Sequence, residues 1–109
     1  SDTTYHYTHG DRVYCYASVF APSGLKTSVV HKWEYYDKNS GAWTLHEKIP
    51  YSIIGDRDGG YRGYSFIESV RDGSWRCSVE TPRGQVIGRA TFKIETGSVP
   101  KPLVSRVDI

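Results

Sequence analysis

The segment RVYCYASVF (residues 12–20) decides the fold, because apolar and polar side chains alternate along it. One face receives Val13, Cys15, Ala17 and Val19, and the other receives Tyr14, Tyr16 and Ser18. A period of two residues is the signature of a β-strand with one buried face. We therefore expect this segment to be a strand whose small apolar side chains face a core.

Six further segments show short runs of the same kind, each bounded by turn residues. They cover residues 29–36, 42–48, 51–54, 61–67, 75–81 and 86–94. Asp37 to Gly41 has the Asn, Ser and Gly composition of a hairpin turn, and no segment has a convincing helical period. About seven short strands of this kind predict an all-β fold, a sandwich or a barrel.

The two cysteines favour an immunoglobulin-like two-sheet sandwich. Cys15 and Cys77 fall on different expected strands among inward-facing apolar residues, and Trp33 lies on a strand between them. The order Cys, Trp, Cys is that of immunoglobulin domains, in which a disulfide joins the sheets and packs on a buried Trp. The two residues form either this disulfide or a pair of buried free thiols, which behave as small apolar side chains.

A chain of 109 residues has the size of one domain. We expect an N-terminal extension over residues 1–9, the sandwich over 10–96, and a linker or a docked edge strand over 97–109. Since the first residue is Ser, we interpret the chain as a piece of a larger protein.

Composition excludes several classes of partner. The chain has 14 Lys and Arg against 12 Asp and Glu, a net charge of +2, and these charges are evenly spread. Such a small excess argues against a nucleic-acid partner. No apolar run approaches the roughly 18 residues that a membrane span needs, so we expect no direct membrane insertion of this fragment.

The order of several short motifs resembles a bacterial family of proteins of unknown function, domain of unknown function 2914. The matching pieces are residues 10–16, 21–25, 30–33, 60–65, 73–76, 79–81 and 84–88. The chain departs from the family pattern in the hairpin of residues 37–44 and at Cys77. The resemblance implies an extracytoplasmic (periplasmic or cell-surface), membrane-adjacent location and brings no assigned activity.

Aromatic residues are the main candidates for ligand binding. Tyr14, Tyr16 and Tyr36 form an aromatic strip on a solvent face if their strands are neighbours. Trp43 lies at the end of the 37–44 hairpin, and we expect it to be largely exposed. Nine Tyr and three Trp also suit the structural needs of strands, so core packing is the competing interpretation.

Arg62 and His31 are the charged and titratable candidates. Alternation places Arg62 with Tyr64 and Phe66, which we expect to face inward. A buried guanidinium needs a carboxylate partner, and Asp72 is the residue expected to supply it. In the alternative hypothesis, Arg62 and His31 together hold an anionic group.

No motif in the sequence predicts catalysis, a metal or a cofactor. His6 and His9 are spaced to chelate a metal but have no acidic or Cys partner at standard spacing. Asp56, Asp58 and Gly59 resemble part of a calcium loop that lacks the closing Glu. No nucleophile elbow, phosphate loop or metalloprotease motif occurs.

The sequence therefore predicts a non-catalytic interaction domain with no cofactor and no metal. The partner is expected to be a protein or another component of the cell envelope. The alternative is a carbohydrate-binding module, in which Trp43 and exposed Tyr side chains stack on sugar rings. Sugar binding requires coplanar exposed rings, whereas a protein contact tolerates an irregular patch.

Overall fold

The computed structural model describes residues 3–20, 26–54, 60–68, 70–97 and 103–108. Within these ranges the chain forms eight strands and no helix. The strands are β1 (Thr3–Tyr7), β2 (Val13–Phe20), β3 (Lys26–Asp37), β4 (Ala42–Ile54), β5 (Gly60–Ile67), β6 (Gly73–Glu80), β7 (Val86–Thr96) and β8 (Leu103–Asp108). The prediction of an all-β chain is confirmed.

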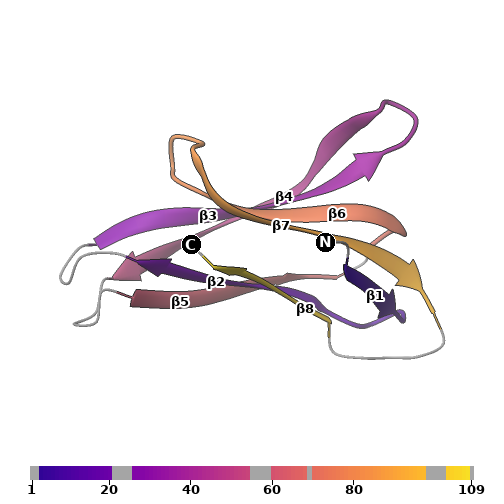
Figure 1. Cartoon of the computed structure of the whole chain (residues 1–109), viewed down its shortest axis with the longest axis horizontal. Coiled ribbons are helices and arrows are strands. Elements are labelled where there is room, and N and C mark those ends of the chain that lie inside the picture. Colours follow the sequence, from indigo (N-terminus) through magenta and orange to yellow (C-terminus); the bar gives the residue numbers. More distant parts are fainter. Residues whose placement is uncertain (1–2, 21–25, 55–59, 69, 98–102, 109) are drawn as a thin grey trace.

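The strands form two sheets that lie over one another as the layers of a sandwich (Figure 1). One sheet has five strands in the order β1-β7-β6-β3-β4, and the other has three in the order β5-β2-β8. The pairs β1–β7 and β2–β8 are parallel, and the remaining pairs are antiparallel. The hairpin between β3 and β4 extends beyond the sandwich at the upper right of Figure 1. The predicted two-sheet sandwich is thus confirmed.

Both ends of the chain contribute strands. Within the expected extension of residues 1–9, residues 3–7 form a strand of the sandwich, because β1 pairs with β7 and Tyr7 is buried in the core. The tail takes the second of its two predicted forms, since β8 docks as an edge strand beside β2. The terminal segments therefore belong to the sandwich.

The expected break at Pro50 does not end a strand. Strand β4 runs through Pro50, which lies opposite Val30 of β3. A proline has no N–H to donate to a neighbouring strand, and it is tolerated here because β4 is the edge of its sheet. The two segments predicted on either side of this residue are accordingly one strand.

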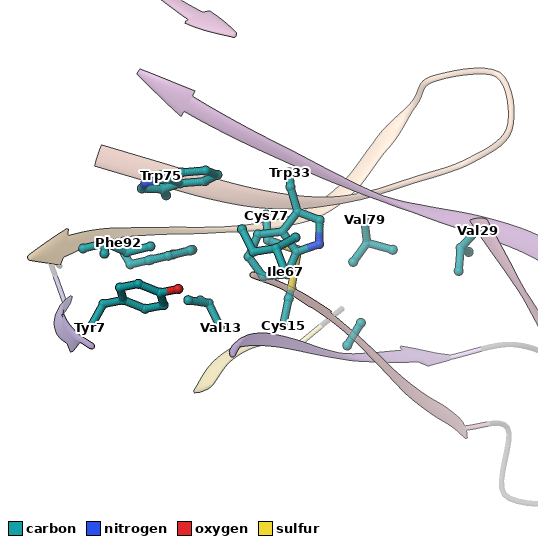
Figure 2. Packing of buried hydrophobic residues seen from close by; sticks show 12 residues of the cluster. Tyr7, Val13, Cys15, Val29, Trp33, Ile67, Trp75, Cys77, Val79 and Phe92 are labelled. Atoms are coloured by element: carbon teal, nitrogen blue, oxygen red, sulfur yellow. A yellow bond between two sulfur atoms is a disulfide. The ribbon is translucent and has the colours of Figure 1, made fainter. Parts of the chain in front are cut away.

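The core lies between the sheets and is built around large aromatic side chains (Figure 2). Trp33, Trp75 and Phe92 are fully buried. Cys15 of β2 and Cys77 of β6 form a disulfide that joins the two sheets beside Trp33, with the Cα atoms 6.6 Å apart. The disulfide alternative is confirmed, and with it the immunoglobulin-like order of Cys, Trp and Cys.

The expected orientation of β5 is wrong. Ser65 and Ile67 face the core with 4% and 2% of their surface exposed, whereas Tyr64 is 58% exposed. Ser65 lies opposite Cys15 in the register with β2 and accepts a hydrogen bond from Trp33 in the interior. Because its hydroxyl has buried partners, the polar residue faces inward and the tyrosine faces solvent.

A register shift also alters the end of the β6–β7 pair. Phe92 and Ile94 are buried, but Val86 is 42% exposed, although strict alternation along residues 86–94 would put all three side chains on one face. The register shifts between Val79 and Glu80, so that Glu80 pairs with Val86. A bulge of this kind changes which residues face the core, and Val86 consequently does not share the buried face of Phe92 and Ile94.

Candidate functional site

An aromatic cluster lies on the outer face of strands β2 and β5. Tyr14 and Tyr16 of β2 lie opposite Phe66 and Tyr64 of β5 in the antiparallel register. We call these four residues the aromatic face. Tyr16 is 40% exposed and Tyr64 is 58% exposed, while Tyr14 and Phe66 are half-buried. The same strands direct Cys15 and Ser65 into the core, so strand alternation itself holds the rings outward.

The rings contact one another but share no plane. The ring centroids of Tyr14 and Tyr16 are 6.1 Å apart with an angle of 25° between the planes. Tyr16 and Tyr64 are 5.4 Å apart at 35°, and Tyr14 and Tyr64 are 5.8 Å apart at 52°. Neighbouring rings in a sheet hold each other in place through such contacts. The result is an uneven aromatic surface rather than a flat platform.

Arg12 adds a positive charge at one end of the aromatic face. Its guanidinium carbon lies 4.5 Å from the centroid of the Phe66 ring, which is cation–π geometry. A side-chain hydrogen bond with Tyr14 raises the pKa of Arg12 above its ordinary value. Arginine and tyrosine are the residue types enriched at protein interfaces.

Tyr36 does not join this face. It lies on β3 in the other sheet, where its ring is 5.5 Å from that of Trp43. The prediction of a strip containing Tyr14, Tyr16 and Tyr36 is therefore wrong for Tyr36, because its strand is not a neighbour of β2. Tyr64 and Phe66 take the place of the missing ring.

Trp43 is half-buried, contrary to the expectation that it is largely exposed. The guanidinium carbon of Arg76 lies 4.4 Å from the Trp43 ring centroid, and Tyr36 packs edge-on against the ring. Arg76 is held in turn by Glu34, whose Oε1 accepts a hydrogen bond from Arg76 Nε at 2.8 Å. One ring face is thus covered, which leaves less of Trp43 available for stacking on a sugar.

The ion pairs of the five-stranded sheet explain why Arg76 stays in place. Glu34 is only 5% exposed, and Lys32 lies 3.8 Å from its second carboxylate oxygen. Burial alone would raise the pKa of Glu34, but the hydrogen bond and charge of Arg76 and the charge of Lys32 lower it overall. Glu34 remains ionised and fixes the guanidinium over Trp43.

His31 is fully buried and offers no atom to a ligand at the surface. Its Nδ1 lies 2.6 Å from Ser65 Oγ, which also accepts a hydrogen bond from Trp33 Nε1 at 2.9 Å. Burial lowers the pKa of His31 from 6.5 to about 4, so the imidazole is neutral at pH 7. A neutral buried ring does not supply the cation that the anion-binding hypothesis required of it.

Residue 62 of β5 pairs with Ser18 of β2. The structure does not describe the side chain of Arg62. Its expected partner, Asp72, accepts hydrogen bonds from the backbone N–H and the hydroxyl of Thr96. Asp72 thus joins the start of β6 to the end of β7. The calcium-like turn at Asp56, Asp58 and Gly59 also lies outside the described residues.

Ser65 and His31 are in hydrogen-bond contact, as a catalytic nucleophile and its base would be, but both residues are buried in the core. Ser65 is 4% exposed, and its oxygen accepts the Trp33 hydrogen bond inside the sandwich. A serine nucleophile must reach a substrate carbonyl and stand beside oxyanion donors. The pair instead satisfies the buried polar atoms of Trp33 and His31.

Sequence reasoning missed Arg12, Tyr64 and Phe66. The signal that identifies them is the pairing of residues 13–20 with residues 60–67 in the register observed here. Once Cys15 faces the core, this register sets Ser65 inward and the two aromatic residues outward. Neither segment alone predicts this pairing.

Comparison with known proteins identifies one family. Residues 26–94 match the family model described as Protein of unknown function (DUF2914). No curated protein matches the chain. Among the described residues, no helix is long and apolar enough to cross a membrane. Since the match covers more than half of the 109 residues, the chain belongs to the DUF2914 family of proteins of unknown function.

Proposed function

We propose that this domain is a non-catalytic interaction module whose aromatic face binds a protein or another component of the cell envelope. The observation that carries the proposal is the exposure of Tyr16 and Tyr64 at 40% and 58% within a contiguous aromatic cluster. Exposed tyrosines beside an arginine have the composition of an interface core rather than of an ordinary surface. The remainder of the sheet supplies a rigid support, because the disulfide ties β2 to the opposite layer.

The geometry of the rings favours a protein partner over a glycan. A sugar chain stacks on rings that lie in one plane, whereas the angles on this face range from 25° to 52°. An uneven surface of aromatic rings fits the side chains of a protein partner. The carbohydrate-binding alternative rests on the 25° pair of Tyr14 and Tyr16, the two rings closest to coplanar.

We propose that the domain acts outside the cytoplasm as part of a larger, membrane-associated bacterial protein. The disulfide between Cys15 and Cys77 supports an oxidising compartment, since cytoplasmic thiols are kept reduced. The motif resemblance described above supports the membrane-adjacent part of the proposal.

The test compares two double variants, each of which replaces two exposed large hydrophobic residues of one sheet with serine. Tyr16→Ser with Tyr64→Ser disrupts the aromatic face, and Leu45→Ser with Val86→Ser changes residues of the other sheet that are 51% and 42% exposed. Each immobilised domain is used to capture partners from solubilised envelope of the source cells, and the captured protein is purified and its affinity measured. We expect the tyrosine variant to raise the Kd by at least about tenfold, the size of a hot-spot loss. Equal affinities for the two variants would contradict the proposal.

A glycan array probed with the parent domain and the same two variants distinguishes the carbohydrate-binding alternative from the proposed function. The interaction module should show no binding that depends on Tyr16 and Tyr64. Glycan binding that the tyrosine variant loses and the control variant keeps would instead establish the carbohydrate-binding function.

A further inference from the structure

Three metal-ligating residues meet in the core at the point where the two sheets are joined. The sulfur atoms of Cys15 and Cys77 and an imidazole nitrogen of His31 all lie within 4.8 Å of one another. All three residues are 0% exposed and come from β2, β6 and β3. The disulfide that occupies this point is the yellow bond in Figure 2.

The donor set is that of a zinc site once the disulfide is reduced. Two thiolates and one imidazole are ligands that Zn²⁺ prefers, and Cys₂His sets bind it with a fourth position open to water. Two thiolates and a neutral imidazole also cancel the charge of the ion. A neutral complex is the form that a buried site accepts, whereas a free buried thiolate is costly.

The surroundings of His31 suit a ligand. Metal-binding histidines are oriented by a hydrogen bond at the ring nitrogen that does not bind the metal. In the oxidised protein His31 Nδ1 lies 2.6 Å from Ser65 Oγ, which also accepts a hydrogen bond from Trp33, and these contacts orient the ring.

The distances are also compatible with a metal. Two sulfurs on a tetrahedral zinc stand about 3.8 Å apart, given Zn–S bonds of about 2.3 Å. That separation lies inside the 4.8 Å within which the three ligand atoms already gather. Breaking the S–S bond lets the sulfurs reach it by rotation of the cysteine side chains, with the Cα atoms starting 6.6 Å apart.

We propose that the reduced domain binds one Zn²⁺ ion through Cys15, Cys77 and His31, and that the disulfide and the zinc site are alternative states of the same core. A dithiol donates two electrons and two protons to the disulfide, becoming a disulfide itself and leaving two cysteine thiols. Zn²⁺ then forms two Zn–S bonds and releases the two thiol protons. This site goes beyond the proposed function and does not depend on the aromatic face.

Cobalt serves as the spectroscopic probe. The whole domain is reduced with a dithiol, the dithiol is removed under nitrogen, and one equivalent of Co²⁺ is added. We expect the visible bands of tetrahedral cobalt together with a thiolate-to-cobalt charge-transfer band, both abolished by one equivalent of Zn²⁺. The oxidised domain should show neither. A reduced, folded domain without the charge-transfer band would overturn the proposal.

Variants test each ligand separately. Cys15→Ser should abolish the charge-transfer band of a two-thiolate site, and His31→Gln should weaken Co²⁺ binding by more than about 100-fold, beyond what loss of an orienting residue costs. His46→Gln is the matched control, because His46 lies outside the cluster. A double variant of His6 and His9 should leave the bands intact, which excludes chelation by these exposed side chains.

A measurement on the unaltered chain covers the case in which a variant fails to fold. In the reduced, isotope-labelled domain, one equivalent of Zn²⁺ should shift the ring resonances of His31 and leave those of His46 in place. Zinc binding with an unshifted His31 resonance would refute the three-residue site.

Discussion

Acid should destabilise this domain through His31, a fully buried imidazole with a pKa of about 4. In the unfolded chain the same group titrates near its ordinary value of 6.5. The folded protein therefore resists the protonation that the unfolded chain accepts. The experiment changes only the pH. The titrating group is the imidazole of His31, which is in hydrogen-bond contact with Ser65, and Ser65 also accepts a hydrogen bond from Trp33.

The sign and the size follow from linkage. Above pH 6.5 the ring is neutral in both states and contributes no pH dependence. Between 6.5 and about 4 only the unfolded chain binds the proton, so the free energy of unfolding falls by about 1.4 kcal/mol per pH unit. Across this window of 2.5 units (6.5 − 4) the loss is on the order of 3 kcal/mol, and below it the contribution is constant.

Urea unfolding at a series of pH values measures this loss. His31→Gln keeps a polar group for Ser65 but cannot titrate, so its free energy of unfolding should decline much less between about pH 6.5 and pH 4.5. His46→Gln is the control, because partial burial also lowers the pKa of His46 but less of that ring is enclosed. The Glu34 carboxylate, with its lowered pKa, contributes at more acidic pH. Parallel pH curves for the parent and His31→Gln would refute the assignment.

Three further substitutions or treatments probe the core and the hairpin. In the absence of zinc, reducing the Cys15–Cys77 bond, which spans 62 residues, should cost about 4 kcal/mol in urea unfolding, and thiol titration of the denatured, unreduced protein should find no free thiol. Trp75→Ala should cost about 3–5 kcal/mol, because Trp75 is 1% exposed, and a melting temperature within a few degrees of the parent would contradict its place in the core. Trp43→Ala should cost about 1–2 kcal/mol through lost contact with Arg76, and a double-mutant cycle with Arg76→Ala that shows no coupling would disprove that cause.

The sequence predicted the layers of the fold because alternation and turns are local signals. Strand β2 alternates strictly, and its inward set of Val13, Cys15 and Ala17 is buried as expected. The cysteine order was informative because a disulfide between sheets needs both sulfurs to face the same core. Strand β1 could not be predicted in this way, since its pairing with β7 joins residues almost 90 positions apart, as in Thr3 with Phe92.

The orientation of β5 shows what alternation leaves undecided. A period of two residues divides a strand into two faces but does not say which one is buried. In β5 one set contains the aromatic residues Tyr64 and Phe66 and the other contains Ser65 and Ile67, so residue type alone does not decide the orientation. Ser65 faces inward because His31 and Trp33 supply partners for its hydroxyl, and those partners come from another sheet.

Only the part of the candidate site that lies on a single strand could be predicted from the sequence. Tyr14 and Tyr16 share a face of one strand, so their pairing required no knowledge of topology. Adding Tyr36 required the order of strands, and β3 lies in the other sheet. The expectation for Trp43 failed because a hairpin that projects from the sandwich can still cover its own rings with a neighbouring arginine.

Strand β2 carries core residues on one face and the proposed binding surface on the other. Its inner face carries Cys15, which ties the sheets together, and its outer face carries Tyr14 and Tyr16 of the aromatic face. Exposed rings contribute little to the free energy of unfolding, whereas the side chains of the buried face contribute most of the hydrophobic stabilisation. Substituting Tyr16 should therefore alter binding while the sandwich keeps its melting temperature. We expect the outer face to tolerate substitution without loss of the fold, because Val13, Cys15 and Ala17, which bury β2 against the core, point the other way.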